Sequence, residues 1–111
     1  MSSNISWNNS IPIVDLESEP TSISDPNVID IDKTRNMFIS GEFTSSNEYE
    51  NVSVKVMFFN SMQDTFSYSG ITLNLSEDSN LEIVNSYGLP LGFVVDSEDN
   101  VSGFSLLVGT Q

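Results

Sequence analysis

The chain has 111 residues, sixteen acidic against three basic side chains, and a net charge of −13. It contains no histidine and no cysteine, which excludes imidazole acid–base catalysis, thiol nucleophiles, disulfides and thiolate metal sites. The charge argues against nucleic acid and anionic membranes as partners, because both are bound through Lys and Arg. Composition therefore predicts a protein that is not an enzyme, and its charge favours a basic partner, a cation, or solubility alone.

The apolar content is high enough for folding, since Ile, Val, Leu and Phe account for 34 residues. Alanine, the best helix former, is absent, whereas Ser, Asn and Thr together account for 38 residues. These polar residues favour turns and solvated strand faces. At this length we expect one domain, and this composition predicts an all-β fold.

The first 36 residues differ from the rest, because three of the four prolines, Pro12, Pro20 and Pro26, fall there among acidic and serine residues. We interpret residues 1–36 as an extended, acidic N-terminal arm and residues 37–111 as the folded domain. Residues 11–14 are expected to form a short edge strand or docking segment, since proline is confined to sheet edges. Residues 29–31 alternate apolar and acidic side chains and predict the first true strand or its approach.

From Met37 onward, apolar and polar residues alternate with the period of a β-strand. The parity of the alternation switches at Ser69 and Gly70, which predicts a bulge or corner. Residues 91–95 and 104–108 are expected to pair as a hairpin across a five-residue loop, residues 96–100. About seven short antiparallel strands follow, which is typical of an immunoglobulin-like β-sandwich. The apolar positions of these strands are Met37, Ile39 and Phe43; Val52, Val54, Val56 and Phe58; Phe66 and Tyr68; Ile71, Leu73 and Leu75; Leu81 and Ile83; Leu91, Phe93 and Val95; and Phe104, Leu106 and Val108.

One part of the chain resembles a known family. Residues 38–47 end a strand in a glycine-containing turn approach, and residues 49–60 contain Asn51-Val52 followed by alternating valines and Phe58-Phe59. Residues 38–83 thereby resemble the FxLYD-type domain, an immunoglobulin-like sandwich of surface-exposed prokaryotic proteins. The chain departs from that pattern at Asn60, which replaces Asp, at the missing glycine after it, and at Glu77-Asp78, which replace Pro-Gly. The resemblance implies binding or spacing, without catalysis.

A calcium site is the most plausible chemistry for the acidic residues, since hard cations take carboxylate and amide oxygens. Asp96, Glu98 and Asn100 alternate like the start of a calcium loop. The EF-hand pattern then fails, because Val101 and Leu107 stand where Gly and Glu are required. An acidic hairpin without a metal explains the segment equally well, so calcium is the only cofactor that the sequence suggests.

Several apolar residues lie in polar surroundings and are candidates for contact with a partner. They include Trp7 near the N-terminus and Phe59 on the predicted solvent side of its strand, next to Met57. Alternatively, both faces of that strand are covered, or the arm folds over it. An apolar arm is also what strand exchange with a neighbouring molecule requires. The predicted contact residues are Trp7, Ile11, Ile13, Val14 and Phe59.

Three functions compete on this evidence. The first is a structural or binding module, an accessory protein of a phage head or tail or of another surface assembly, acting as an oligomer or within a larger complex. The second is an acidic inhibitor that mimics nucleic acid and blocks a nuclease or defence enzyme. The third is a trimmed cell-surface sandwich domain. Residues 1–10 lack the basic and apolar regions of a signal peptide, so we expect synthesis in the cytoplasm and a final location in the virion or outside the cell.

Overall fold

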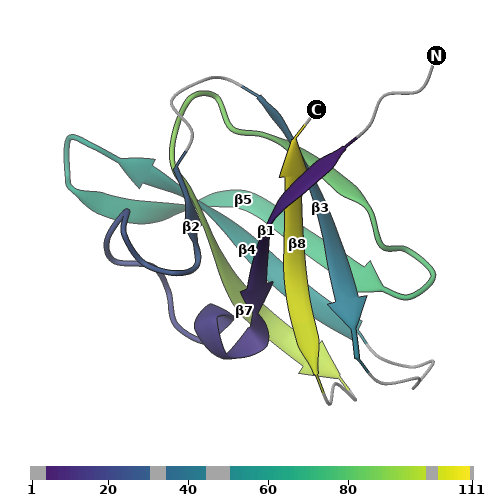
Figure 1. Ribbon diagram of the computed structural model, residues 1–111. Coiled ribbons are helices and arrows are strands. Elements are labelled where there is room, and N and C mark those ends of the chain that lie inside the picture. Colours follow the sequence, from purple (N-terminus) through teal and green to yellow (C-terminus); the bar gives the residue numbers. More distant parts are fainter. Residues whose placement is uncertain (1–4, 31–34, 45–50, 100–102, 111) are drawn as a thin grey trace.

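The computed structural model describes residues 5–30, 35–44, 51–99 and 103–110. These residues form eight strands and one 3-10 helix, without an α-helix, in two four-stranded sheets packed face to face (Figure 1). All strand pairings are antiparallel. The predicted all-β sandwich is confirmed, whereas its immunoglobulin-like character stays a prediction.

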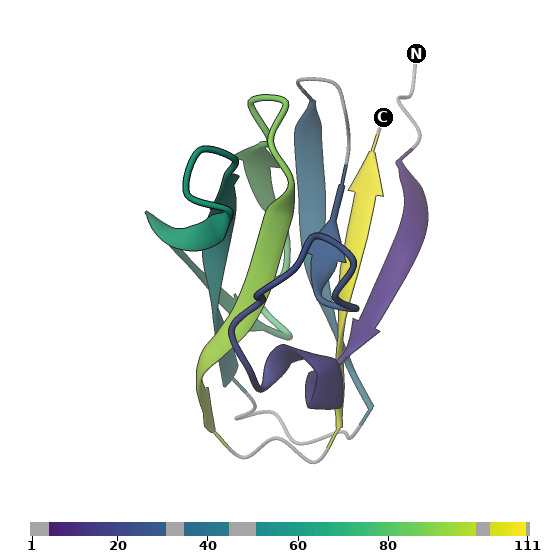
Figure 2. The same ribbon diagram turned by 90° about the vertical axis from the view of Figure 1, so that its left-hand side faces the viewer.

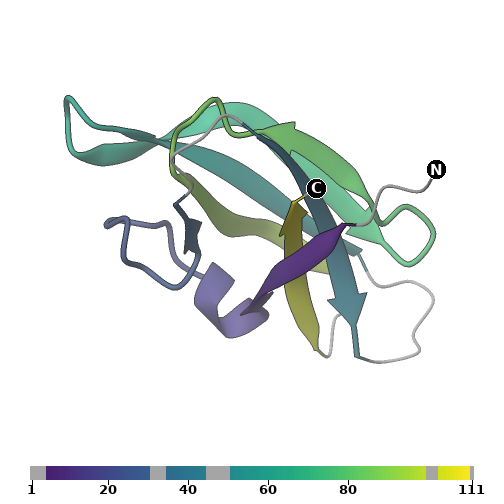
Figure 3. The same ribbon diagram turned by 45° about the horizontal axis from the view of Figure 1, so that its top comes forward.

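The first sheet, called sheet A, has the strand order β1-β8-β3-β6. Its strands are β1 (Ser6–Pro12), β8 (Phe104–Thr110), β3 (Asn36–Phe43) and β6 (Glu82–Asn85). The second, sheet B, has the order β2-β7-β4-β5. Its strands are β2 (Val28–Ile29), β7 (Leu91–Asp99), β4 (Asn51–Asn60) and β5 (Thr65–Ser76). The β4–β5 hairpin projects beyond the body of the sandwich (Figure 3).

The core between the sheets is built from the alternating apolar positions of the central strands. Val52, Val54 and Val56 of β4 are fully buried, as are Ile39 of β3 and Phe93 of β7. Alternate residues of a strand point to the same face of its sheet, so the period-two pattern of the sequence selected the inward side chains correctly in these strands.

The predicted bulge lies in β5. Lys55 pairs with Thr72 and Met57 with Tyr68, so Val56 of β4 faces residues 69–71 of β5. Gly70 has a φ of 88°, a conformation that side-chain-bearing residues rarely adopt. The bulge adds two residues, so the alternation is preserved across it: Phe66 and Tyr68 lie on the outer face with Phe59 and Met57, whereas Leu73 and Leu75 lie on the core face with Val54 and Val52. The switch in the sequence pattern therefore records a change in which face of β5 is apolar.

The N-terminal segment does not form a separate arm, so the boundary expected between residues 36 and 37 is wrong for the described residues. β1 pairs with β8, and β2 pairs with β7. Between them, the 3-10 helix η1 (Ile13–Leu16) places Leu16 in the core with no exposed surface. Pro12 lies at the end of edge strand β1, where a missing N–H is tolerated. The prolines therefore mark turns and edges of the domain.

The hairpin expected from residues 91–95 and 104–108 is also wrong. β7 belongs to sheet B and β8 to sheet A, where β8 lies between β1 and β3. Residues 96–99, which the prediction assigned to the loop, continue β7, and residues 97–99 pair with β4 beyond a register shift at Asp96. Both strands have one apolar face and pack against the same core, so their alternation could not distinguish pairing within a sheet from packing between sheets.

Candidate binding surface

An apolar row crosses the outer face of sheet A. Trp7 of β1 pairs with Gly109 of β8, Gly109 pairs with Phe38 of β3, and Phe38 pairs with Ile83 of β6. Directly paired residues project from the same face of a sheet. Phe38 is 9% exposed yet lies outside the core cluster between the sheets, which is consistent with its place on the outer face. The row therefore runs over all four strands.

The row is exposed to solvent at both ends. Trp7 is 42% exposed and Ile83 58%, while Leu81, two residues before Ile83, is 54% exposed. Leu107, which pairs with Ser40 in the adjacent row, is half-buried. We call this surface the sheet A patch. Its members are Trp7, Phe38, Leu81, Ile83 and Leu107.

Gly109 allows Trp7 of the patch to lie close to the sheet. A Cβ atom at this position would come within 2.9 Å of the Trp7 ring and 2.6 Å of the Ile5 side chain. The indole thus contacts the backbone of β8 instead of extending freely into solvent. A ring held in this way loses little conformational freedom on binding, which favours its use as a contact residue.

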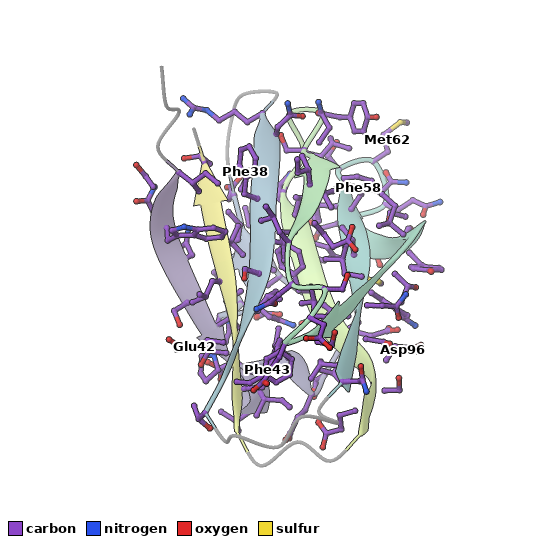
Figure 4. All side chains as sticks on the ribbon, turned by 90° about the vertical axis from the view of Figure 1, so that its right-hand side faces the viewer. Phe38, Glu42, Phe43, Phe58, Met62 and Asp96 are labelled. Atoms are coloured by element: carbon purple, nitrogen blue, oxygen red, sulfur yellow. The ribbon has the colours of Figure 1, made fainter. Side chains whose placement is uncertain are left out.

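The surroundings of the patch are weakly acidic. Glu42 and Glu82 are the charged residues of the four sheet A strands, all of which are described completely, and Glu42 is the one on the outer face, since Glu82 pairs with the core residue Ile39. Figure 4 shows Glu42 on β3, beyond Phe38 along the same strand. An apolar centre with an acidic margin is complementary to a partner surface with an apolar centre and basic margin.

The part of the outer face of sheet B around Gly92 is covered by the protein's own chain. Residues 17–27 follow η1, and this segment, the cover segment, passes over β7 (Figure 2). Pro20 is buried above Gly92, where an added Cβ would collide with the proline ring and would also lie 3.3 Å from Phe66. Glu19 forms an ion pair with Lys55 of β4, with 3.9 Å between Oε1 and Nζ. The N-terminal region thus folds over β7 and reaches β4 through this ion pair, whereas its folding over β4 itself stays a prediction.

A buried asparagine fixes the end of the cover segment. Asn27 is 3% exposed, and its Nδ2 donates hydrogen bonds to the carbonyls of Ser18 (3.0 Å) and Phe93 (2.8 Å). The N–H of Phe93 in turn donates to the carbonyl of Asn27 at 3.0 Å. Asn27 therefore joins the two ends of the cover segment and anchors both to β7.

A carboxylate organises the turn in the middle of the cover segment. Oδ2 of Asp25 accepts hydrogen bonds from the N–H groups of Thr21 (2.8 Å) and Ser22 (3.1 Å) and from the Thr21 hydroxyl. The bond from the Thr21 N–H, followed by that from Ser22, lowers the pKa of Asp25. Asp25 is thus a turn cap that stays ionised at neutral pH.

The predicted contact residues separate into two groups. Trp7 belongs to the patch, and Val14 is exposed, so both are available to a partner. Ile11 is 3% exposed and belongs to the core, which makes its prediction as a contact residue wrong, since β1 turns this side chain inward. Ile13 packs against the core, and Phe59 packs on Phe66 with 5.2 Å between ring centroids. Neither presents a free side chain.

Residues missed in the sequence complete the exposed surface. Leu81 and Ile83 were recognised as a strand, but Val84 is its buried residue. An apolar hollow of about 340 Å³ lies beside the turn end of the projecting hairpin and is lined by Phe58, Phe59, Asn60, Ser61, Ser67 and Leu89. Met62 at the hairpin tip points away from the body (Figure 4). Exposed apolar residues in the turns 61–64 and 86–90 were the available signal.

The acidic residues proposed for calcium lie at the end of β7. Asp96 and Glu98 are exposed, and Asn100 lies outside the described residues. Among the residues that the structure describes, no group of three or more His, Cys, Asp or Glu side chains is arranged to hold a metal ion. The three-residue calcium site stays a prediction.

Comparisons with known proteins give no family assignment. A scan against models of protein families, a search of curated proteins and a search of solved structures each found no match. The resemblance to the FxLYD-type domain therefore stays a prediction. In the described part of the chain, no helix has the length and apolar character needed to cross a membrane.

Proposed function

We propose that this protein is a non-enzymatic binding module that docks onto a protein partner through the sheet A patch. The observation that carries the proposal is the row from Trp7 to Ile83, in which two exposed apolar side chains flank the buried Phe38 on an outer sheet face. Exposed apolar side chains gathered on one face are typical of interaction sites, and aromatic residues are enriched at interface centres. The expected partner surface is apolar at its centre and basic at its margin.

The setting that we propose is an assembly outside the cell, a virion in particular, in which the chain is an accessory subunit. The small all-β fold and the high content of Ser, Asn and Thr support this setting. The high net charge supports solubility at the concentrations such an assembly needs. The inhibitor and cell-surface functions have no comparable structural observation in their favour.

The proposal is tested by removing the patch. The double variant Trp7→Ser with Ile83→Ser should lose co-sedimentation with particles from the source cells, while Val14→Ser with Met62→Ser should retain it. The control residues are also exposed and apolar, but lie on η1 and on the β4–β5 turn. Both variants should unfold at the same temperature as the unmodified protein within a few degrees, because exposed substitutions change stability little.

Two outcomes would contradict the proposal. In the first, the patch variant and the control bind particles equally. In the second, the chain is recovered with a nucleic-acid-handling enzyme instead, and that binding survives the patch variant but disappears at high salt. The second outcome would favour the inhibitor.

A further inference from the structure

The four edges of the two sheets differ in how they are protected against pairing with another strand. β2 has two residues and β6 has four, so both offer short edges. β1 ends in Pro12 and has a register shift between Trp7 and Asn9. Short strands, proline and irregular register are the usual means by which proteins prevent strand addition. Three of the four edges are therefore protected.

The fourth edge, β5, is the longest strand of the described chain. Its twelve residues contain no proline and no charged side chain, in a protein with a net charge of −13. β5 pairs with β4 on one side and is last in the order of sheet B. Its one irregularity is the bulge at residues 69–71, where a Cβ on Gly70 would meet no atom within 4 Å. The bulge interrupts pairing locally, as the register shift does in β1, and the N–H groups of Ile71 and Ser76 are bonded to Ser69 Oγ and to the Ser79 carbonyl, each at 3.1 Å. Residues 65–68 and 72–75 remain as two stretches with no strand paired to them on this side in the described part of the chain.

The charges that border this uncharged strand decide what can pair with it. Asp64 precedes β5, and Glu77 and Asp78 follow it. In a full-length antiparallel pair of two copies, Asp64 of one chain would face Glu77 of the other, and a parallel pair would align each acid with itself. Like charges directly opposite destabilise strand pairs, so self-pairing along the whole edge is disfavoured.

We infer that the free edge of β5 accepts a strand from a partner protein, and that this strand is uncharged in its middle and carries Lys or Arg at both ends. Main-chain hydrogen bonds on either side of the bulge supply the binding, as in other cases of strand addition. The basic ends pair with Asp64 and with Glu77 and Asp78. This inference rests on the proposed binding function, yet it uses a surface separate from the sheet A patch.

Peptide binding to the full chain tests this inference. The probe is a twelve-residue peptide of alternating Thr and Val with two lysines at each end. Its controls have glutamates at the ends or a central proline, which removes a strand N–H. The lysine-ended peptide should bind, should slow amide hydrogen exchange in β5, and should bind at least tenfold more tightly than either control.

A charge variant tests the flanks. Asp64→Asn with Glu77→Gln and Asp78→Asn should weaken binding of the lysine-ended peptide about tenfold, as expected for the loss of several exposed ion pairs. Asp15→Asn with Glu17→Gln and Asp30→Asn changes the net charge equally but away from β5 and from the sheet A patch, and should weaken it less than twofold. Asn at position 64 retains the positive φ of 54° found there.

Three results would contradict the inference about the β5 edge. If both charge variants weakened peptide binding equally, the attraction would depend on net charge alone, and this result would overturn the inference. Exchange protection in β1 instead of β5, or a dimer paired through β5, would overturn it as well. Since none of these measurements involves Trp7 or Ile83, failure at the β5 edge leaves the test of the sheet A patch intact, and the converse also holds.

Discussion

The two outer faces of the sandwich differ in how their apolar side chains are covered. Each face carries apolar side chains and a central glycine, Gly92 in sheet B and Gly109 in sheet A. Over Gly92 the chain places Pro20, at the centre of a segment fixed by buried hydrogen bonds. Over Gly109 it places Trp7, which stays 42% exposed. A face that is completed within the chain serves stability, whereas a face left incomplete is available to a partner.

The largest effect is expected where the cover segment begins. Leu16→Ala removes a side chain with no exposed surface from the core and should lower the free energy of unfolding by about 2–5 kcal/mol. Val14→Ala, at an exposed position of the same 3-10 helix, should change it by less than about 0.5 kcal/mol. Urea denaturation measures both. Similar losses in the two variants would mean that η1 is not anchored through Leu16.

The two glycines give the most direct comparison of the faces. Gly92→Ala forces its methyl group against the rigid Pro20 ring and should destabilise by about 1–3 kcal/mol. Gly109→Ala meets the Trp7 and Ile5 side chains, which can move into solvent, and approaches the Ser6 carbonyl of edge strand β1 at 3.0 Å, so it should cost less than Gly92→Ala. Thermal unfolding orders the two variants, and indole fluorescence should shift in Gly109→Ala alone. Equal destabilisation would mean that Trp7 is held as firmly as Pro20.

Removing Asn27, the anchor of the cover segment, should lower the stability of the fold by a similar amount, but through a different contact. Asn27→Ala removes both side-chain bonds from Nδ2 and leaves the carbonyl of Phe93 with a lost partner. We expect a loss of about 1–3 kcal/mol and faster hydrogen exchange in residues 17–27. Binding through the sheet A patch should not change. A stable variant with unchanged exchange would show that Pro20 alone retains the segment.

The smallest effect concerns the turn at Asp25 and depends on pH. Its folded-state pKa lies below the ordinary value of 3.8, so its hydrogen bonds stabilise the fold above that value and are lost as pH falls through the lowered pKa. Asp25→Ala should be less stable than the unmodified protein at pH 7, and the difference should shrink toward pH 2. Urea midpoints at both pH values measure this. A difference independent of pH would exclude the carboxylate as its cause.

Much of the fold followed from the sequence because strand periodicity is a local property. The valines of β4 were assigned to the core correctly, since the alternation depends on which way neighbouring side chains point, and the bulge was correctly placed at Gly70, where the apolar residues of β5 change from the outer face to the core face. The N-terminal region was misassigned because its apolar residues are isolated, and only an edge elsewhere in the chain gives them partners. Ile11, predicted to contact a partner, instead contacts the core.

The candidate surface could be predicted only in part, because only its local features are visible in the sequence. Trp7 is conspicuous in a polar segment, but Phe38, Gly109 and Ile83 are 31 to 102 residues away from it in sequence. Nothing local places them in one row, because strand order joins them.

The sequence by itself determined an all-β chain, the inward parity of the central strands, the bulge of β5 and an acidic surface, because composition and period two are properties of neighbouring residues. Only the tertiary structure decided that β7 and β8 belong to different sheets, that residues 17–27 cover one face, and that Trp7 and Ile83 share the other. These outcomes depend on which strand edges pair across the chain. The alternation of apolar and polar residues does not specify which edges pair, since any strand with one apolar face can pack against the same core.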